Sequence, residues 1–349
     1  MNRKDVDDWY AGKAFPFSKP DSELGYLHVD RDFKEGMDGA ICQYRYDELD
    51  ARRMIAHAGE TCRINTYGNS FTSCEQVSDP ETWQEALAGH IGEPVRNYGI
   101  GGYSVYQAYL RMLREERRAP AKYIVFNVYD DDHYRNLSAW RRIRFGFNRR
   151  AVSGTIPYVE VDPQKDLFVE HANPCPTQKS YEAFFDLDSA YAQLKNDSLL
   201  KSRVERTLKK AAGESVPRGD FEDENLTQLG IFASRKIVEK IEAFAGANDR
   251  KILYVLSYSP QNIRRMMTQG SRFDTEFVRF LDEQRLSYVD TLKAHVADYA
   301  QFRIDVTRYL KRYFVGHYNP LGNHFQAFAI KDKLVAMMDP KPPAYSRST

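Results

Sequence analysis

A serine early in the chain and a histidine near its end are the residues best suited to acyl transfer. Ser70 lies in the segment Gly-Asn-Ser-Phe-Thr, directly after the strand-like run RINTY, and His317 lies in the segment GHYNPLG. A serine hydroxyl attacks a carbonyl usefully only when a nearby base takes its proton. A neutral imidazole accepts and returns a proton near physiological pH. We therefore predict Ser70 as a nucleophile and His317 as its general base.

The same chemistry requires hydrogen-bond donors for the oxyanion that forms when a carbonyl is attacked. The backbone N–H groups of Ser70 and Gly102 are the predicted donors, and Gly102 ends the glycine-rich segment NYGIGG. Glycine suits this role because it has no Cβ to obstruct a ligand and tolerates unusual backbone angles. The two positions together predict an oxyanion hole built from backbone.

Four sequence blocks in this order resemble those of the SGNH hydrolases, also called GDSL-like esterases and lipases. The likeness runs from about Arg63 to about Ala336 and rests on RINTYGNSFTSCEQVSDPETW, VRNYGIGGYS, KYIVFNVYDDDHYRN and GHYNPLGNHFQAFAI. In the resemblance, Ser70 falls on the nucleophile, Gly102 on the oxyanion glycine and His317 on the catalytic histidine. The resemblance implies a flavodoxin-like, three-layer α/β/α fold with a mostly parallel sheet, and hydrolysis of carboxylic esters.

Two of the departures from the family pattern concern the first and third blocks. Asn69 stands where the family usually has Asp, at a position that mostly shapes the turn. The oxyanion asparagine of the family would fall at Asp131, where an ionised carboxylate would repel the oxyanion. Three alternatives follow: Asp131 is protonated, Asn127 or another donor substitutes, or the hole relies on backbone alone.

The third departure concerns the acid that orients the histidine. The family acid usually lies three residues before the histidine, where this chain has Phe314, and Val315 is not acidic either. His317 is then oriented by a backbone carbonyl, or by a carboxylate such as Glu75 or one of Asp130 to Asp132, or it forms only a dyad. Loss of the orienting acid lowers the rate of comparable triads without abolishing their chemistry.

From Arg63 onward, strand patterns alternate with helix patterns, which predicts a mostly parallel sheet covered on both faces. Strands are expected at 63–67, 94–100, 122–129, 251–258 and 286–290, and helices at 80–91, 104–118, 229–244, within 261–284 and at 323–338. Asp79 is the expected N-cap of the helix at 80–91. Ser70, Gly102 and Asp131 then follow the carboxyl ends of strands, where such sheets bind ligands.

The alternation breaks between residues 133 and 228, which predicts an insertion. We assign 1–60 to an N-terminal lead-in segment, 61–132 and 229–340 to the α/β domain, and 133–228 to an insertion or lid-like region. The aromatic side chains of the insertion form either a small core, which we favour, or an acyl pocket. They are Tyr158, Phe168, Tyr181, Phe184 and Phe185. Its basic run is either a solvated or lid-forming segment or a contact for an anion: Arg141, Arg142, Arg144, Arg149 and Arg150.

The composition is that of an ordinary soluble protein. The chain has 50 basic and 49 acidic residues, so bulk attraction to nucleic acid or an anionic membrane is not expected. No apolar stretch resembles a leader or a membrane span, so we expect a cytoplasmic location unless a leader has been removed. The four cysteines are expected to be free thiols: Cys42, Cys62, Cys74 and Cys175.

The predicted function is serine-dependent hydrolysis of a small or medium carboxylic ester, such as an O-acetyl group on a sugar or metabolite. The expected partner is that small-molecule ester, with no cofactor, and the oligomeric state is open. A metal held by residues 130–133 is disfavoured because consecutive residues of an extended turn point apart. Two other functions stay open: an acyltransferase that uses the same site, and a non-catalytic binding protein on a degraded hydrolase scaffold.

Overall fold

The computed structural model describes residues 3–13, 17–140, 154–215 and 223–346. The basic run between Arg141 and Arg150 lies outside these residues. The chain divides into two compact units. The first, which we call the insertion unit, comprises 1–29, 104–110 and 131–239, and the second, the sheet unit, comprises 30–103, 111–130 and 240–349.

The sheet unit is built on a five-stranded sheet whose strands all run parallel. The strand order is β11 (Tyr288–Asp290), β10 (Lys251–Ser257), β7 (Tyr123–Tyr129), β5 (Ile64–Tyr67) and β6 (Arg96–Asn97). Numbered along the chain, this order is the flavodoxin-like 2-1-3-4-5 arrangement, in which ligands bind where the order reverses, beside the first strand. That first strand is β5. The predicted α/β fold with a mostly parallel sheet is confirmed.

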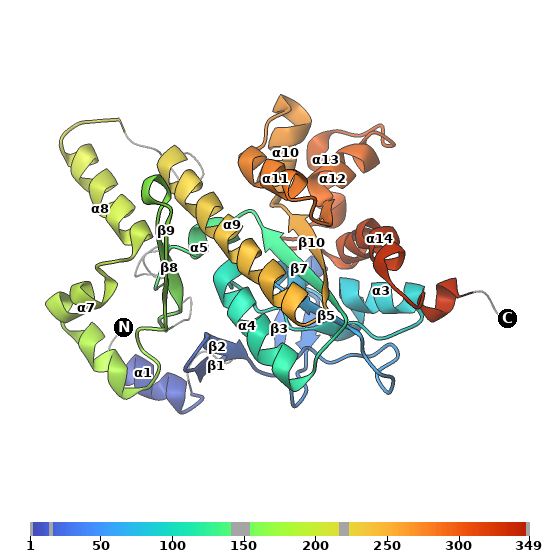
Figure 1. Cartoon of the computed structure of the whole chain (residues 1–349), viewed down its shortest axis with the longest axis horizontal. Coiled ribbons are helices and arrows are strands. Elements are labelled where there is room, and N and C mark those ends of the chain that lie inside the picture. The colour runs from blue at the N-terminus through green and yellow to red at the C-terminus, as the bar shows by residue number, and fades with distance from the viewer. Residues whose placement is uncertain (1–2, 14–16, 141–153, 216–222, 347–349) are drawn as a thin grey trace. The chain divides into compact units, whose positions relative to one another are not determined.

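One face of the sheet packs against α3 (Trp83–Ile91) and α14 (Pro320–Met337), which lie side by side in Figure 1. Apolar side chains from the strands and from both helices form one buried cluster: Ile64, Val125, Leu253, Val289, Trp83, Leu87, Ile330 and Leu334. Buried β-branched and aromatic residues in consecutive strand positions are typical of parallel strands covered on both sides.

The opposite face is covered by parts of α4 (Val105–Arg118) and α9 (Glu224–Ala247) that belong to the sheet unit. Tyr67 donates a hydrogen bond to Glu116 of α4 (2.9 Å), and Tyr254 donates one to Glu242 of α9 (2.8 Å). These buried polar pairs fix each helix against a particular strand, because a lost partner would leave a buried group unsatisfied. The predicted three-layer arrangement is therefore present within the sheet unit.

The helix predicted at 80–91 begins later than expected. A 3₁₀ turn, η2 (Asp79–Glu81), comes first and is capped by Ser78, and α3 then starts with Thr82 as its N-cap. Asp79 does not cap α3, contrary to the prediction, because its carboxylate accepts a hydrogen bond from Arg52 Nε at 2.8 Å. An aspartate committed to a buried arginine is not free to cap a helix.

Among the remaining elements of the sheet unit, α10 (Pro260–Gln269) and α11 (Thr275–Glu283) correspond to the helices predicted within 261–284. The elements that were not predicted are the hairpin of β3 (Arg31–Lys34) and β4 (Ile41–Tyr44), η1 (Met37–Gly39), α2 (Ser70–Ser73), α12 (Thr291–Tyr299), α13 (Val306–Tyr313) and η6 (Pro343–Tyr345). The last helix, α14, starts at Pro320 rather than near Asn323, because Asn319 caps it and proline is favoured at the first helical position.

The insertion unit contains two β-hairpins and several helices. They are α1 (Arg3–Tyr10), β1 (Ser18–Asp21) with β2 (Gly25–His28), α5 (Asp132–Arg135), β8 (Tyr158–Asp162) with β9 (Leu167–His171), η3 (Pro163–Lys165), η4 (Lys179–Phe185), α7 (Leu187–Leu194) and α8 (Ser198–Ala211). Tyr158, Tyr181 and Phe184 are buried, and Phe184 packs edge-on against Trp140 with ring centroids 5.2 Å apart. This arrangement supports a core role for these three aromatic residues. In the described part of the chain, no helix has the length and apolarity needed to cross a bilayer.

Candidate active site

Ser70 is held at the carboxyl end of β5 by a tight turn. Gly68 has a φ of 150°, and a Cβ there would lie 3.0 Å from the Cβ and the carbonyl oxygen of Asn127, so only glycine fits. The side chain of Asn69 caps α2 by accepting a hydrogen bond from the Phe71 N–H at 2.8 Å. Asparagine therefore fills the capping role that aspartate would fill. Ser70 follows as the first residue of α2 and is 6% exposed.

His317 lies in the loop between α13 and α14 and meets Ser70. Its Nε2 atom is 2.8 Å from Ser70 Oγ, although the two residues are 247 positions apart in the sequence. Phe71 packs against the imidazole with ring centroids 5.1 Å apart and against Tyr318 at 5.3 Å. The two residues predicted to act as nucleophile and base are thus in hydrogen-bond contact.

The other imidazole nitrogen, Nδ1, faces Gln76, a residue that was not predicted from the sequence as part of the site. Gln76 Oε1 is 3.2 Å from His317 Nδ1 and also accepts a hydrogen bond from the His317 backbone N–H at 2.6 Å. The amide nitrogen of Gln76 donates to the carbonyl oxygen of Glu35 at 3.3 Å, which fixes the orientation of the amide. Because Gln76 Oε1 can only accept, Nδ1 carries the proton. Nε2 is then the unprotonated nitrogen and can accept the proton of Ser70, as a general base requires.

The carboxylates considered as orienting groups lie elsewhere. Glu75 Oε2 is 3.8 Å from His317 Nε2, the nitrogen that faces the serine, and not beside Nδ1. Asp130 accepts hydrogen bonds from the Ser259 N–H (2.8 Å) and from Asn262 (2.7 Å). In the insertion unit, Arg135 donates to both Asp131 (2.9 Å) and Asp132 (2.6 Å). The contact that orients the ring is therefore an amide and not an acid.

The two backbone N–H groups predicted as oxyanion donors have no acceptor among the described residues. The N–H groups of Ser70 and Gly102 donate to no other group within the described part of the chain. Gly102 has a φ of 83°, which favours glycine. The side chain of Asn127 is 1% exposed, and its Oδ1 accepts a hydrogen bond from Ser257 at 2.7 Å, while its Nδ2 has no hydrogen-bond partner among the described residues. Asp131 pairs with Arg135, which favours its acceptor-only carboxylate form.

A buried histidine anchors the loop that carries His317. His295 lies between two tyrosines, with Nδ1 2.9 Å from Tyr309 Oη and Nε2 2.8 Å from Tyr318 Oη. Burial lowers the pKa of His295 from 6.5 to about 3. Tyr318 follows His317 directly, so the buried histidine fixes the position of the loop next to the candidate base.

The depressed pKa of His295 predicts a pH-dependent stability. Between about pH 6.5 and about pH 3 the unfolded chain binds a proton at this residue that the folded chain does not, so acidification favours unfolding. The free energy of unfolding should fall by up to about 1.4 kcal/mol per pH unit in this window because of His295. Urea unfolding at a series of pH values should show a smaller slope for His295→Gln. The exposed His324→Gln serves as control, and an unchanged slope in His295→Gln would contradict the prediction.

In the comparisons with known proteins, no family model and no curated protein matches the sequence. Several solved structures do match. Axe2, an acetylxylan esterase from Geobacillus stearothermophilus, is 10% identical with a TM-score of 0.41, over 78% of this chain and 93% of that chain. The acetyl xylan esterase AlAXEase is 13% identical with a TM-score of 0.39, over 79% and 100% of the two chains.

A third match is described as a lipolytic protein of the G-D-S-L family from Desulfitobacterium hafniense DCB-2. It is 11% identical with a TM-score of 0.39, over 77% of this chain and 98% of that chain. The proteins returned by the structure comparison thus carry the names of esterases and of the lipolytic family that the sequence blocks resemble.

Proposed function

We propose that the chain is a serine-dependent hydrolase of carboxylic esters that acts through an acyl-enzyme on Ser70. The observation that carries the proposal is the contact of 2.8 Å between Ser70 Oγ and His317 Nε2, with Nδ1 held by Gln76. A hydroxyl in hydrogen-bond contact with a base that is itself oriented by a third group is the arrangement that activates a serine nucleophile.

In the first half of the reaction, Ser70 Oγ attacks the ester carbonyl carbon and its proton passes to His317 Nε2. The carbonyl oxygen becomes an oxyanion, which accepts hydrogen bonds from the N–H groups of Ser70 and Gly102. The tetrahedral intermediate then collapses. The bond to the leaving oxygen breaks, and His317 gives its proton to the departing alcohol.

In the second half, a water molecule takes the place of the alcohol. His317 accepts a proton from this water, whose oxygen attacks the acyl carbon and forms a second oxyanion in the same hole. Collapse of this intermediate returns the proton to Ser70 Oγ and releases the carboxylic acid. These steps need no cofactor. Asp131 and Asn127 are assigned no part in them, because the first is ion-paired and the second is buried in the sheet.

The substrate we propose is an ester of a small or medium acyl group, with an O-acetyl group on a sugar or metabolite as the first class to test. An acyl-enzyme of this kind can also pass its acyl group to an alcohol instead of water. Incubation with a chromogenic acetyl ester, with and without sugar acceptors, followed by product analysis, separates the two. Acetylated acceptor in place of free acetate would assign an acyltransferase.

Covalent labelling by an organophosphonate tests whether Ser70 is reactive. Intact-mass measurement should show one adduct on the wild-type chain, and peptide mapping should place it on Ser70. The adduct should be absent from Ser70→Ala and should form more slowly in His317→Ala, since the hydroxyl then lacks its base. If the wild-type chain stays unlabelled where a reference serine esterase reacts, catalysis is contradicted, and a non-catalytic binding protein becomes the better interpretation.

A further inference from the structure

The turn that follows α2 approaches His317 with two adjacent side chains. Gln76 Oε1 lies 3.2 Å from Nδ1, and Glu75 Oε2 lies 3.8 Å from Nε2. We propose that these two residues divide the work of a single triad acid: Gln76 orients the imidazole, and Glu75 supplies the negative charge that stabilises its protonated form. This inference rests on the proposed function, because it describes how the same Ser70–His317 pair is supported.

The backbone of the turn explains how two neighbouring side chains reach one ring. Successive side chains of an extended chain point to opposite sides. Here Cys74 (φ 58°) and Gln76 (φ 72°) both adopt the left-handed conformation on either side of Glu75. Such angles are uncommon for residues other than glycine, and they persist where the surroundings enforce them, often at functional sites. The strained turn therefore directs both side chains toward His317.

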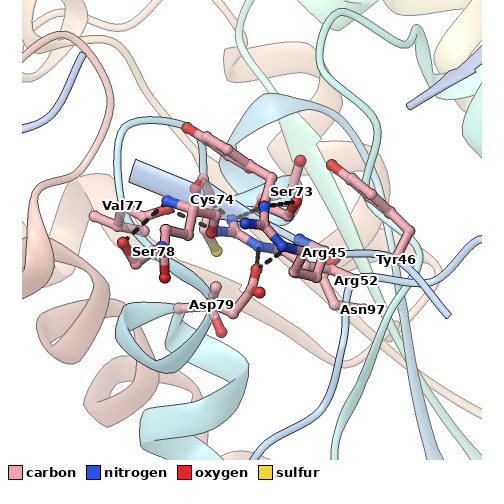
Figure 2. A network of polar contacts seen from close by, with 12 residues as sticks. Arg45, Tyr46, Arg52, Ser73, Cys74, Val77, Ser78, Asp79 and Asn97 are labelled. Atoms are coloured by element: carbon pink, nitrogen blue, oxygen red, sulfur yellow. Dashed lines mark hydrogen bonds and ion pairs between the residues drawn. The ribbon is translucent and has the colours of Figure 1, made fainter. Parts of the chain in front are cut away.

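Arg52 holds the turn through hydrogen bonds to residues at its two ends, which Figure 2 shows. Its guanidinium donates hydrogen bonds to the carbonyl oxygens of Ser73, of Cys74 (2.7 Å) and of Val77 (2.6 Å), while Nε donates to Asp79 (2.8 Å). The Arg52 side chain is 1% exposed. Only the planar, five-donor fork of arginine can bind several carbonyl groups of one turn and a carboxylate at once.

A second set of contacts holds Gln76 itself. Its backbone N–H donates to Tyr44 Oη at 2.7 Å, and Tyr44 in turn donates to the Glu35 carboxylate at 2.5 Å. The Gln76 amide nitrogen donates to the Glu35 carbonyl oxygen. The amide of Gln76 is thus fixed at its nitrogen by Glu35 and at its oxygen by His317, which makes it an orienting group with little freedom.

Orientation alone does not replace an acid, because an amide oxygen carries no net charge. When His317 takes the proton of Ser70 it becomes an imidazolium, which a nearby carboxylate stabilises. Glu75 is placed for this: its side chain is 24% exposed and lies beside the nitrogen that gains the proton. Among the described residues, the other titratable or charged groups next to the ring's contacts are Glu35, Tyr44 and Arg52. The charge of Glu75 also raises the pKa of Tyr44, but this tyrosine is neutral at the pH of the acid limb with or without that charge.

Substitutions that move the carboxylate from the Nε2 side of His317 to the Nδ1 side test whether Glu75 supplies charge and Gln76 supplies orientation. Glu75→Gln should lower the pKa of His317, so the acid limb of the kcat/KM–pH profile should move to lower pH by about one unit, with about a 10-fold lower plateau. Gln76→Glu places a carboxylate at Nδ1 and should move the limb to higher pH by about one unit. The double variant Glu75→Gln/Gln76→Glu keeps the total charge and should return the limb toward its wild-type position.

Gln76→Ala separates orientation from charge. Glu75 remains in this variant, so the acid limb should stay near its wild-type position, while kcat should fall about 100-fold because the ring is no longer held in line with Ser70. Glu283→Gln removes one exposed carboxylate from α11 and is the matched control for the loss of charge. It should change neither the limb nor the rate.

An NMR titration of the His317 imidazole provides a readout that does not depend on turnover. The inference is overturned if Glu75→Gln and Gln76→Glu leave the His317 pKa unchanged or move it in the same direction, since a purely structural role produces no opposed shifts. If the wild-type chain hydrolyses no ester and Ser70 is not labelled, the proposed function fails, while the titration still decides whether the two side chains divide these roles.

Discussion

The Ser70→Ala variant is expected to lose about 10⁶-fold in kcat toward a chromogenic acetyl ester, the loss seen when a serine nucleophile is removed from a comparable site. The reason is that Ser70 Oγ is the atom that would bond to the acyl carbon, and it lies 2.8 Å from its proposed base, His317 Nε2. KM should change much less than kcat, because the substitution removes a single oxygen atom. Steady-state kinetics at high enzyme concentration measure both constants.

Ser73→Ala is the matched control for this experiment. Ser73 is buried in the same short helix, α2, three residues after Ser70, and has no contact with His317 among the described residues. Its replacement should leave kcat close to that of the wild-type chain. Substantial ester hydrolysis by Ser70→Ala, or equal losses in both variants, would contradict a nucleophilic role for Ser70.

Replacing His317 by alanine should have the second large effect, a loss of about 10⁵- to 10⁶-fold in kcat. Without the imidazole, Ser70 loses the base that contacts it at 2.8 Å, and the leaving alcohol loses its proton donor. The double variant Ser70→Ala/His317→Ala should be no worse than either single variant, because the two residues act as one unit. Comparing the three rates with the same ester tests this non-additivity.

His324→Ala distinguishes His317 from the histidine that lies seven residues further along the chain. His324 lies in the first turns of α14, and its Nε2 faces His90 Nε2 at 3.4 Å instead of Ser70. Its replacement should leave kcat nearly unchanged. A loss in His324→Ala together with an active His317→Ala would show that the base has been assigned to the wrong residue.

The sheet was predictable from the sequence because its strands bury both faces. The seven-residue runs that became β7 and β10 are mostly apolar, and helix patterns separate them from the other strands. The start of α3 was not predictable in the same way. Asp79 resembles an ordinary N-cap in the sequence, and only the fold shows that a buried arginine from a distant segment binds its carboxylate.

The residues of the candidate site whose role follows from their type could be predicted. Those whose role follows from a contact between distant segments could not. Ser70, Gly102 and His317 occur in recognisable segments. Gln76 does not lie in such a segment, and glutamine is common on protein surfaces. Its contact with His317, 241 positions away, depends on the left-handed backbone angles of the turn that contains it. Arg52 was missed for a related reason: arginines are seldom fully buried, and a segment without clear periodicity gave no sign of one.

The distance along the chain between Ser70 and His317 has a consequence for biosynthesis. The serine emerges from the ribosome 247 residues before its base, and α14, which packs beneath the finished sheet, is made later still. A growing polypeptide therefore carries an unactivated hydroxyl until His317 has been made and α14 has folded. Truncated products that end before His317 should be chemically inert.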